Sequence, residues 1–124
     1  MRLASVGAVA AGFAATFVLS VGGDVVMHVT GVFPPMDVPM SGALFAWALT
    51  YRVVASVGGG YVTARLAPER PWVHAQALMA VGTVAGCLGV VAWFAGGPAM
   101  GPLWYPVAIV LTAPPAIGLG ARLV

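Results

Sequence analysis

Arg52 is a permanent charge in the middle of an apolar stretch that runs from Ser41 to Ala64. A guanidinium keeps its proton at physiological pH, and placing it near the centre of a bilayer costs at least ~2.5–3.5 kcal/mol. Its chemistry is that of a hydrogen-bond donor and an anion partner. Thr50 and Tyr51 directly precede it, so several polar side chains share one depth of the stretch. The charge therefore needs a partner elsewhere in the chain.

Two consecutive prolines create one set of partners. Pro114 and Pro115 cannot donate to the carbonyls of Val110 and Leu111, and an unpaired carbonyl in lipid is costly. Counting ~1.5 Å per residue from the start of each apolar stretch, Arg52 and Pro114 both lie about 16 Å deep. We expect the guanidinium to cap the two carbonyls, either as a staple between helices or as part of a site for a substrate or an ion. The predicted polar membrane core consists of Arg52, Tyr51, Thr50, Thr83, Thr112, Pro114 and Pro115.

Asp24 is the alternative partner by charge. A helix that starts at Leu3 rises about 31 Å before it reaches Asp24, which places the carboxylate near the outer surface. A direct pair with Arg52 requires that the two preceding glycines break the helix and fold the segment back into the bundle. Otherwise Asp24 is an interfacial residue, and together with His28, four residues later, it forms an outer-face polar site.

Methionines gather around this outer site. Thioether and imidazole groups suit Cu(I), and the i, i+4 spacing of Asp24 and His28 suits a divalent ion. The weak candidates for a metal site are Met27, His28, Met36, Met40 and Met100. Methionine is also an ordinary apolar filler for an irregular cap, and on this interpretation we predict no metal and no cofactor.

The sequence contains no recognisable catalytic motif. It has no nucleophile motif, no glycine loop that would cradle a phosphate and no carboxylate pair. We therefore predict no catalytic residues. An enzyme of this sequence would have to use Asp24, His28, Tyr51 or Arg52, and their spacing selects no reaction.

Transmembrane helices are the elements that must position these residues. Hydrophobic residues make up 61% of the 124 residues and charged residues 6%, which leaves too little polar surface for a soluble domain. The apolar stretches cover residues 3–23, 41–64, 72–95 and 103–119, each close to the ~20 residues that cross a ~30 Å hydrocarbon core. We expect an all-α four-helix transmembrane bundle that forms a single domain over residues 1–124. No segment remains for a nucleic-acid surface or a cofactor fold.

The positive charges indicate the orientation in the membrane. Arginines precede the first stretch, lie between the second and the third, and follow the fourth: Arg2, Arg65, Arg70 and Arg122. The remaining connections carry Asp24 and Asp37. By the positive-inside rule, both termini and the 65–71 loop are cytoplasmic, and we place the protein in a bacterial inner membrane as a multi-pass protein.

Local signals indicate helix ends and packing faces. Ser41 suits the N-cap of the second helix, and Pro71 suits the first position of the third. Small residues at four-residue spacing, such as Gly82 and Gly86, favour close helix packing within the bundle, with an oligomer face as the alternative. Cys87 is the single cysteine, so no internal disulfide can form, and we expect it to be buried.

Several stretches resemble small four-helix bacterial integral membrane proteins. They are Tyr51-Arg52, Gly59-Gly60-Tyr61, Ala64 to Pro68, Arg70-Pro71, His74-Ala75 and Gly101 to Pro106. The resemblance covers most of the chain and implies the fold, but no activity. The length is also similar to that of the small multidrug resistance transporters. Those carry a membrane-embedded glutamate in the first helix, and this chain has none there.

Two functional hypotheses follow from the sequence. The first is a non-catalytic structural or accessory component, surrounded by lipid, that forms a homo-oligomer or joins a larger membrane complex. The alternative is a small transporter or channel that uses the polar layer around Arg52 and Asp24. A transporter should have a water-accessible path from Asp24 toward Arg52, whereas a structural protein should have Arg52 sealed by carbonyls and apolar side chains. No nucleic-acid partner is expected.

Overall fold

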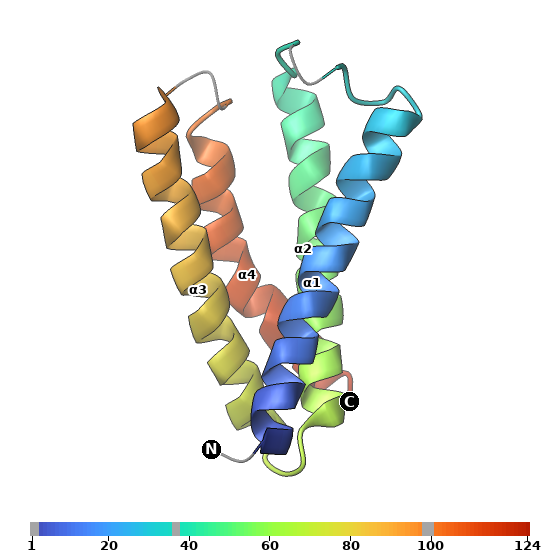
Figure 1. The fold of residues 1–124 in the computed structure, drawn as a ribbon, viewed down its shortest axis with the longest axis vertical. Helices are drawn as coiled ribbons and strands as arrows, with labels where there is room; N and C mark the ends of the chain where they lie inside the picture. The colour runs from blue at the N-terminus through green and yellow to red at the C-terminus, as the bar shows by residue number, and fades with distance from the viewer. Residues whose placement is uncertain (1–2, 36–37, 98–100) are drawn as a thin grey trace.

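The computed structural model describes residues 3–35, 38–97 and 101–124. The described part of the chain is all-α and contains the helices α1 (Leu3–Val29), α2 (Gly42–Leu66), α3 (Pro71–Gly96) and α4 (Trp104–Arg122). Successive helices run in opposite directions, and the start of α1 and the end of α4 lie at the same end of the bundle as the short loop between α2 and α3 (Figure 1). We call this the terminal end and the opposite one the far end. The predicted all-α four-helix bundle is confirmed.

Three of these helices are long and apolar enough to cross a membrane: α1, α3 and α4. Large apolar side chains on their outer faces are exposed, among them Phe17 at 60%, Leu88 at 64% and Leu111 at 69%. So much exposed apolar surface belongs in lipid. The 25-residue α2 carries Arg52 and is not among these three helices, so a fourth crossing remains a prediction.

Helix boundaries agree with several of the local signals and differ at two ends. Ser41 caps α2 by accepting a hydrogen bond from the backbone N–H of Leu44, and α3 starts at Pro71. α1 continues to Val29, six residues beyond the predicted end at Gly23, because the paired glycines lie within the helix and do not break it. α4 likewise extends to Arg122 instead of residue 119.

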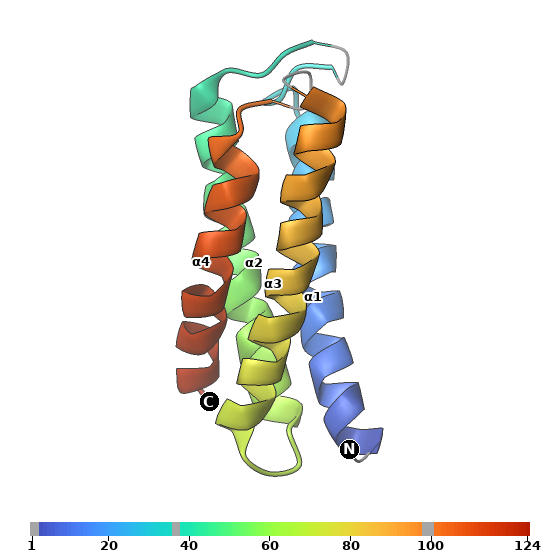
Figure 2. The same ribbon diagram turned by 90° about the vertical axis from the view of Figure 1, so that its left-hand side faces the viewer.

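Glycines bring α2 against α4 in the terminal half of the bundle. A Cβ on Gly60 would overlap the backbone of Ile117, and a Cβ on Gly120 would overlap the backbone of Val57. The two helices therefore meet backbone to backbone at this glycine crossing, as small residues allow in lipid. Toward the far end the α1/α2 pair and the α3/α4 pair diverge (Figure 1); in the view of Figure 2, α3 and α4 lie in front of α1 and α2.

α1 crosses α2 in a similar way. A Cβ on Gly12 would overlap the side chain of Thr63, which is completely buried. The Thr63 hydroxyl donates to the backbone carbonyl of Ala8 at 3.0 Å, so one interhelical hydrogen bond accompanies the close approach.

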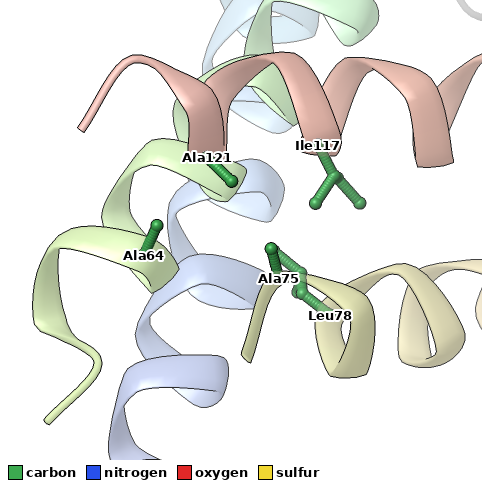
Figure 3. Close-up of a cluster of buried hydrophobic side chains, with 5 residues drawn as sticks. All are labelled: Ala64, Ala75, Leu78, Ile117 and Ala121. Carbon is green, nitrogen blue, oxygen red and sulfur yellow. The ribbon is translucent and has the colours of Figure 1, made fainter. Parts of the chain in front are cut away.

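A small apolar core closes the terminal half. Figure 3 shows its members on α2, α3 and α4: Ala64, Ala75, Leu78, Ile117 and Ala121. Leu78 is one of the largest completely buried side chains of the described residues, and three of the other four members of the core are alanines. The core is thin because the helices approach one another closely.

His74 is a buried residue of α3 with two polar contacts. Its Nε2 lies 2.9 Å from the Ser5 hydroxyl and its Nδ1 3.0 Å from the Arg70 carbonyl. This polar contact joins α1 to α3. Cys87 is exposed on the surface of α3 and not buried as expected.

Candidate functional site

Asp24 of α1 and Arg52 of α2 form an ion pair. Arg52 Nη2 lies 2.6 Å from Asp24 Oδ2, a short charge-assisted hydrogen bond. The side chain of Arg52 is 26% exposed and that of Asp24 is 31% exposed, so the pair is enclosed only in part. Pairing the guanidinium offsets the cost of placing it within an apolar bundle.

Tyr105 connects the pair to α4. Arg52 Nε donates to the Tyr105 hydroxyl at 2.6 Å. The Tyr105 ring packs against Phe45, with ring centroids 5.0 Å apart, which holds the phenol between α2 and α4. One guanidinium thus joins three helices: α1, α2 and α4.

Tyr51 completes the hydrogen bonding of the carboxylate. Its hydroxyl donates to Asp24 Oδ1, the oxygen that Arg52 does not bind. The Arg52 guanidinium also lies 5.7 Å from the centroid of the Tyr51 ring, within cation–π distance. The Tyr51 ring also lies near Phe33, a buried residue of the loop between α1 and α2, at a centroid distance of 6.4 Å. We call Asp24, Tyr51, Arg52 and Tyr105 the polar clamp.

The direction of helical side chains explains why the polar clamp forms. Side chains on an α-helix tilt toward the helix N-terminus. Because α1 and α2 are antiparallel, Asp24 leans toward the terminal end and Arg52 toward the far end. With a rise of ~1.5 Å per residue, Asp24 lies about 7.5 Å below the last residue of α1, and Arg52 about 15 Å below the first of α2. The two side chains converge across this difference in depth.

The expected capping of the carbonyls before Pro114 and Pro115 is wrong. Within the described residues, the donors of Arg52 bond to Asp24 and Tyr105. The glycine crossing offsets α4 against α2, so that Pro114 lies about one turn nearer the terminal end than Arg52. The Arg52 side chain leans away from the prolines, and α4 continues through both of them.

The predicted threonines do not belong to the polar clamp. Thr50 donates to the Ala46 carbonyl at 2.9 Å, and Thr112 donates to the Ala108 carbonyl at 2.7 Å, each within its own helix. Thr83 is half-buried on α3, and among the described residues it has no bond to the clamp. The structure thus brings Arg52 and Tyr51 together from the predicted membrane core.

His28 binds the backbone and not the carboxylate of Asp24. Its Nδ1 donates to the Asp24 carbonyl at 2.8 Å, and its ring meets Phe33 edge to face at 5.4 Å. Asp24 Oδ1 and Oδ2 bond to Tyr51 and Arg52, and neither oxygen bonds to the His28 ring.

The methionine candidates fall into two groups. Met27 Sδ accepts from Trp47 Nε1 at 3.0 Å, and Met40 is half-buried at the start of α2. Met36 and Met100 lie outside the described residues. Residues 3–35, 38–97 and 101–124 contain no group of three or more His, Cys, Asp or Glu side chains that could hold a metal ion.

A cavity of about 340 Å³ adjoins Arg52, a size typical of small-ligand sites. All four helices contribute to its lining: Phe13, Thr16, Phe17, Ser20, Val21, Arg52, Ser56, Gly82, Ala85, Gly86, Gly89, Pro106, Ile109 and Ala113. Gly89 borders open space, because no atom lies within 4 Å of the position its Cβ would take. In the described part of the chain, Arg52 Nη1 has no protein acceptor.

Tyr105 and Gly23 belong to the candidate site in the structure, although the sequence did not indicate them. From the sequence, Tyr105 is typical of the aromatic residues at a membrane–water interface. Its hydroxyl becomes a candidate hydrogen-bond partner of Arg52 only once the Arg52 side chain is known to lean toward the far end. Gly23 has the appearance of a helix end. A Cβ there would lie 2.7 Å from two ring carbons of Tyr51, so its role depends on the neighbouring helix.

Comparison of the chain with protein-family models, with curated proteins and with solved structures found no match.

Proposed function

We propose that the chain is a small polytopic membrane protein that binds an amphipathic ligand at Arg52, as a small transporter or as a ligand-binding subunit of a larger membrane complex. The observation that carries the proposal is the cavity beside Arg52. A purely structural charge pair is best sealed, because unpaired donors in lipid are costly. Here the guanidinium keeps donors without a protein acceptor in the described residues and lines a cavity shared by all four helices.

The chemistry of the lining defines the ligand. Its walls are mainly apolar, with phenylalanine and alanine side chains, whereas Arg52, Ser20 and Ser56 supply polar groups. The ligand therefore has an apolar body and at least one hydrogen-bond acceptor, such as a carbonyl, hydroxyl, carboxylate or phosphate oxygen. Asp24 already neutralises the guanidinium, so a full negative charge on the ligand is not required.

A second candidate function is a non-catalytic structural component that self-associates or joins a larger complex. One observation supports it: the polar clamp joins α1, α2 and α4 and balances its charge within a single chain. On either proposal the setting is the bacterial inner membrane, with both termini in the cytoplasm. The placement of Arg65, Arg70 and Arg122 at the terminal end supports that orientation.

Filling the cavity tests ligand binding. Gly89→Leu places a side chain in open space beside the cavity, so the protein should fold while the site is occupied. Gly22→Leu is the matched control, because it makes the same change at an exposed helical glycine outside the cavity lining. Mass spectrometry of the organic extract of gently solubilised protein should find a species retained by wild type and Gly22→Leu and lost from Gly89→Leu. Identical extracts from all three proteins would contradict the proposal.

A further inference from the structure

A second cavity, of about 410 Å³, lies between α3 and α4 toward the terminal end. Its lining includes Trp72 and Met79 of α3 and Pro115, Gly118 and Arg122 of α4. Gly118 opens the groove, since a Cβ there would approach Met79 Cε to 3.2 Å and Trp72 Cη2 to 3.3 Å. Most of the lining is apolar, and its one charged residue, Arg122, lies at one end of the groove.

Arg122 gives the groove a cationic end. It is the last residue of α4, and its side chain is exposed. The guanidinium lies 5.3 Å from the centroid of the Trp72 ring, within cation–π distance. Trp72 is 41% exposed at the start of α3, a position where indole rings mark the membrane–water interface. The charge is therefore held at the depth of lipid headgroups.

We propose that this groove binds one anionic phospholipid, with its phosphate at Arg122 and an acyl chain along the apolar groove between α3 and α4. Charge complementarity selects the headgroup, because a guanidinium can bind a phosphate through parallel N–H bonds. Basic pockets between transmembrane helices near the cytoplasmic face are sites for anionic headgroups. The two prolines and Gly118 provide a shallow wall against which an acyl chain can lie. The site contains no residue of the Arg52 cavity, so it stands apart from the proposed function.

Native mass spectrometry of the full chain in detergent tests the proposal. Phosphatidylglycerol and phosphatidylcholine with identical acyl chains are added separately, and inorganic phosphate is added as a competitor. We expect wild type to bind phosphatidylglycerol about fivefold more tightly than phosphatidylcholine, the preference that one arginine near the surface provides. Arg122→Gln should remove the preference. Arg65→Gln, which removes the same charge at the same end, should keep it.

Three results would overturn the proposal. Equal binding of the two lipids by wild type would deny a headgroup site. Equal loss of preference in Arg65→Gln and Arg122→Gln would assign the effect to the general charge of the terminal end. Displacement of the lipid by millimolar inorganic phosphate would identify a free-anion site.

Fluorescence of the unaltered protein provides a second measurement in case Arg122→Gln fails to fold. Phosphatidylglycerol with brominated acyl chains should quench Trp72, and the quenched component should be absent from Trp72→Phe. Equal quenching of Trp72 by brominated phosphatidylcholine would contradict the proposal.

Discussion

Gly23 of α1 lies directly against the Tyr51 ring of α2, where a Cβ would stand 2.7 Å from two ring carbons. The missing side chain leaves room for the Tyr51 ring against α1, and the Tyr51 hydroxyl donates to Asp24, the next residue. The neighbouring Gly22 has no atom within 4 Å of its Cβ position. Two adjacent glycines therefore have different roles, and only one of them is needed for the polar clamp.

Gly23→Ala should destabilise the bundle by about 1–3 kcal/mol, because the added methyl displaces the Tyr51 ring and weakens its bond to Asp24. Gly22→Ala is the control. It should leave the free energy of unfolding unchanged or raise it by about 0.5–1 kcal/mol, since alanine is the better helix former. Unfolding of both variants in mixed micelles measures the difference. Equal effects of the two substitutions would show that Tyr51 does not depend on Gly23.

Arg52→Ala should lower the free energy of unfolding by about 1–3 kcal/mol, because Asp24 and Tyr105 both lose a charged donor. Arg52→Lys should restore only part of the lost stability, since a single ammonium group cannot replace the planar guanidinium that bonds to both Asp24 and Tyr105. Thermal unfolding in detergent gives the comparison. An unchanged midpoint for Arg52→Ala would rule out the polar clamp as a structural staple and leave ligand binding as the role of the charge.

Tyr105→Phe should destabilise the protein by about 0.5–1.5 kcal/mol through loss of the acceptor for Arg52 Nε. Tyr61→Phe is a matched control on α2, because Tyr61 is 41% exposed and its hydroxyl has no partner among the described residues. That control should change stability little. In the double variant Arg52→Ala/Tyr105→Phe, the two costs should not add, since both remove the same bond. Additive costs would show that the two residues act independently.

Gly60→Ala should prevent normal packing of α2 on α4, because the new methyl would overlap the backbone of Ile117, which cannot rotate away. The expected loss is about 3 kcal/mol or more, at the upper end of overpacking effects. Gly7→Ala, at a helical glycine with open space around it, should be tolerated. Yield of folded protein and its thermal midpoint measure both. Normal stability of Gly60→Ala would refute the close glycine crossing.

Cysteine labelling tests the orientation, after Cys87→Ala removes the exposed native thiol. Val32→Cys at the far end should react only with reagents added outside the cell, and Ala67→Cys at the terminal end only with reagents that reach the cytoplasm. Val32 is 47% exposed and therefore a better site than the buried Phe33 next to it. Labelling of Val32→Cys from the cytoplasm would reverse the proposed topology.

The sequence predicted the helices well because membrane helices depend on long apolar runs, which are local properties. The N-cap at Ser41 and the start of α3 at Pro71 likewise depend on local sequence. Length alone did not predict the partner of Arg52. The depth estimate treated the start of each apolar run as a common level, whereas α1 continues past its glycines and α4 is offset by the glycine crossing.

Side-chain direction could have corrected that estimate. Asp24 and Arg52 lie on antiparallel helices and lean toward each other, and the same rule turns Arg52 away from Pro114. Other parts of the site cannot be obtained from one sequence. The contact of Tyr51 with Gly23 depends on which glycine faces a neighbouring helix. The cavity beside Gly89 likewise depends on which helix faces turn a glycine toward it.

The glycine crossing of α2 and α4 also determines where the bundle can move. Backbone surfaces meet there without side chains between them, so tilting one helix would separate the surfaces directly. At the far end, α3 is outside the polar clamp, and along the bundle α3 packs more against α4 than against α1 or α2. The crossing therefore holds α2 against α4, and we expect α3, which lies outside both the crossing and the polar clamp, to be the helix that these contacts restrain least. Amide hydrogens should accordingly exchange slowly near Gly60 and Gly120, and faster along α3 from Gly82 toward the far end.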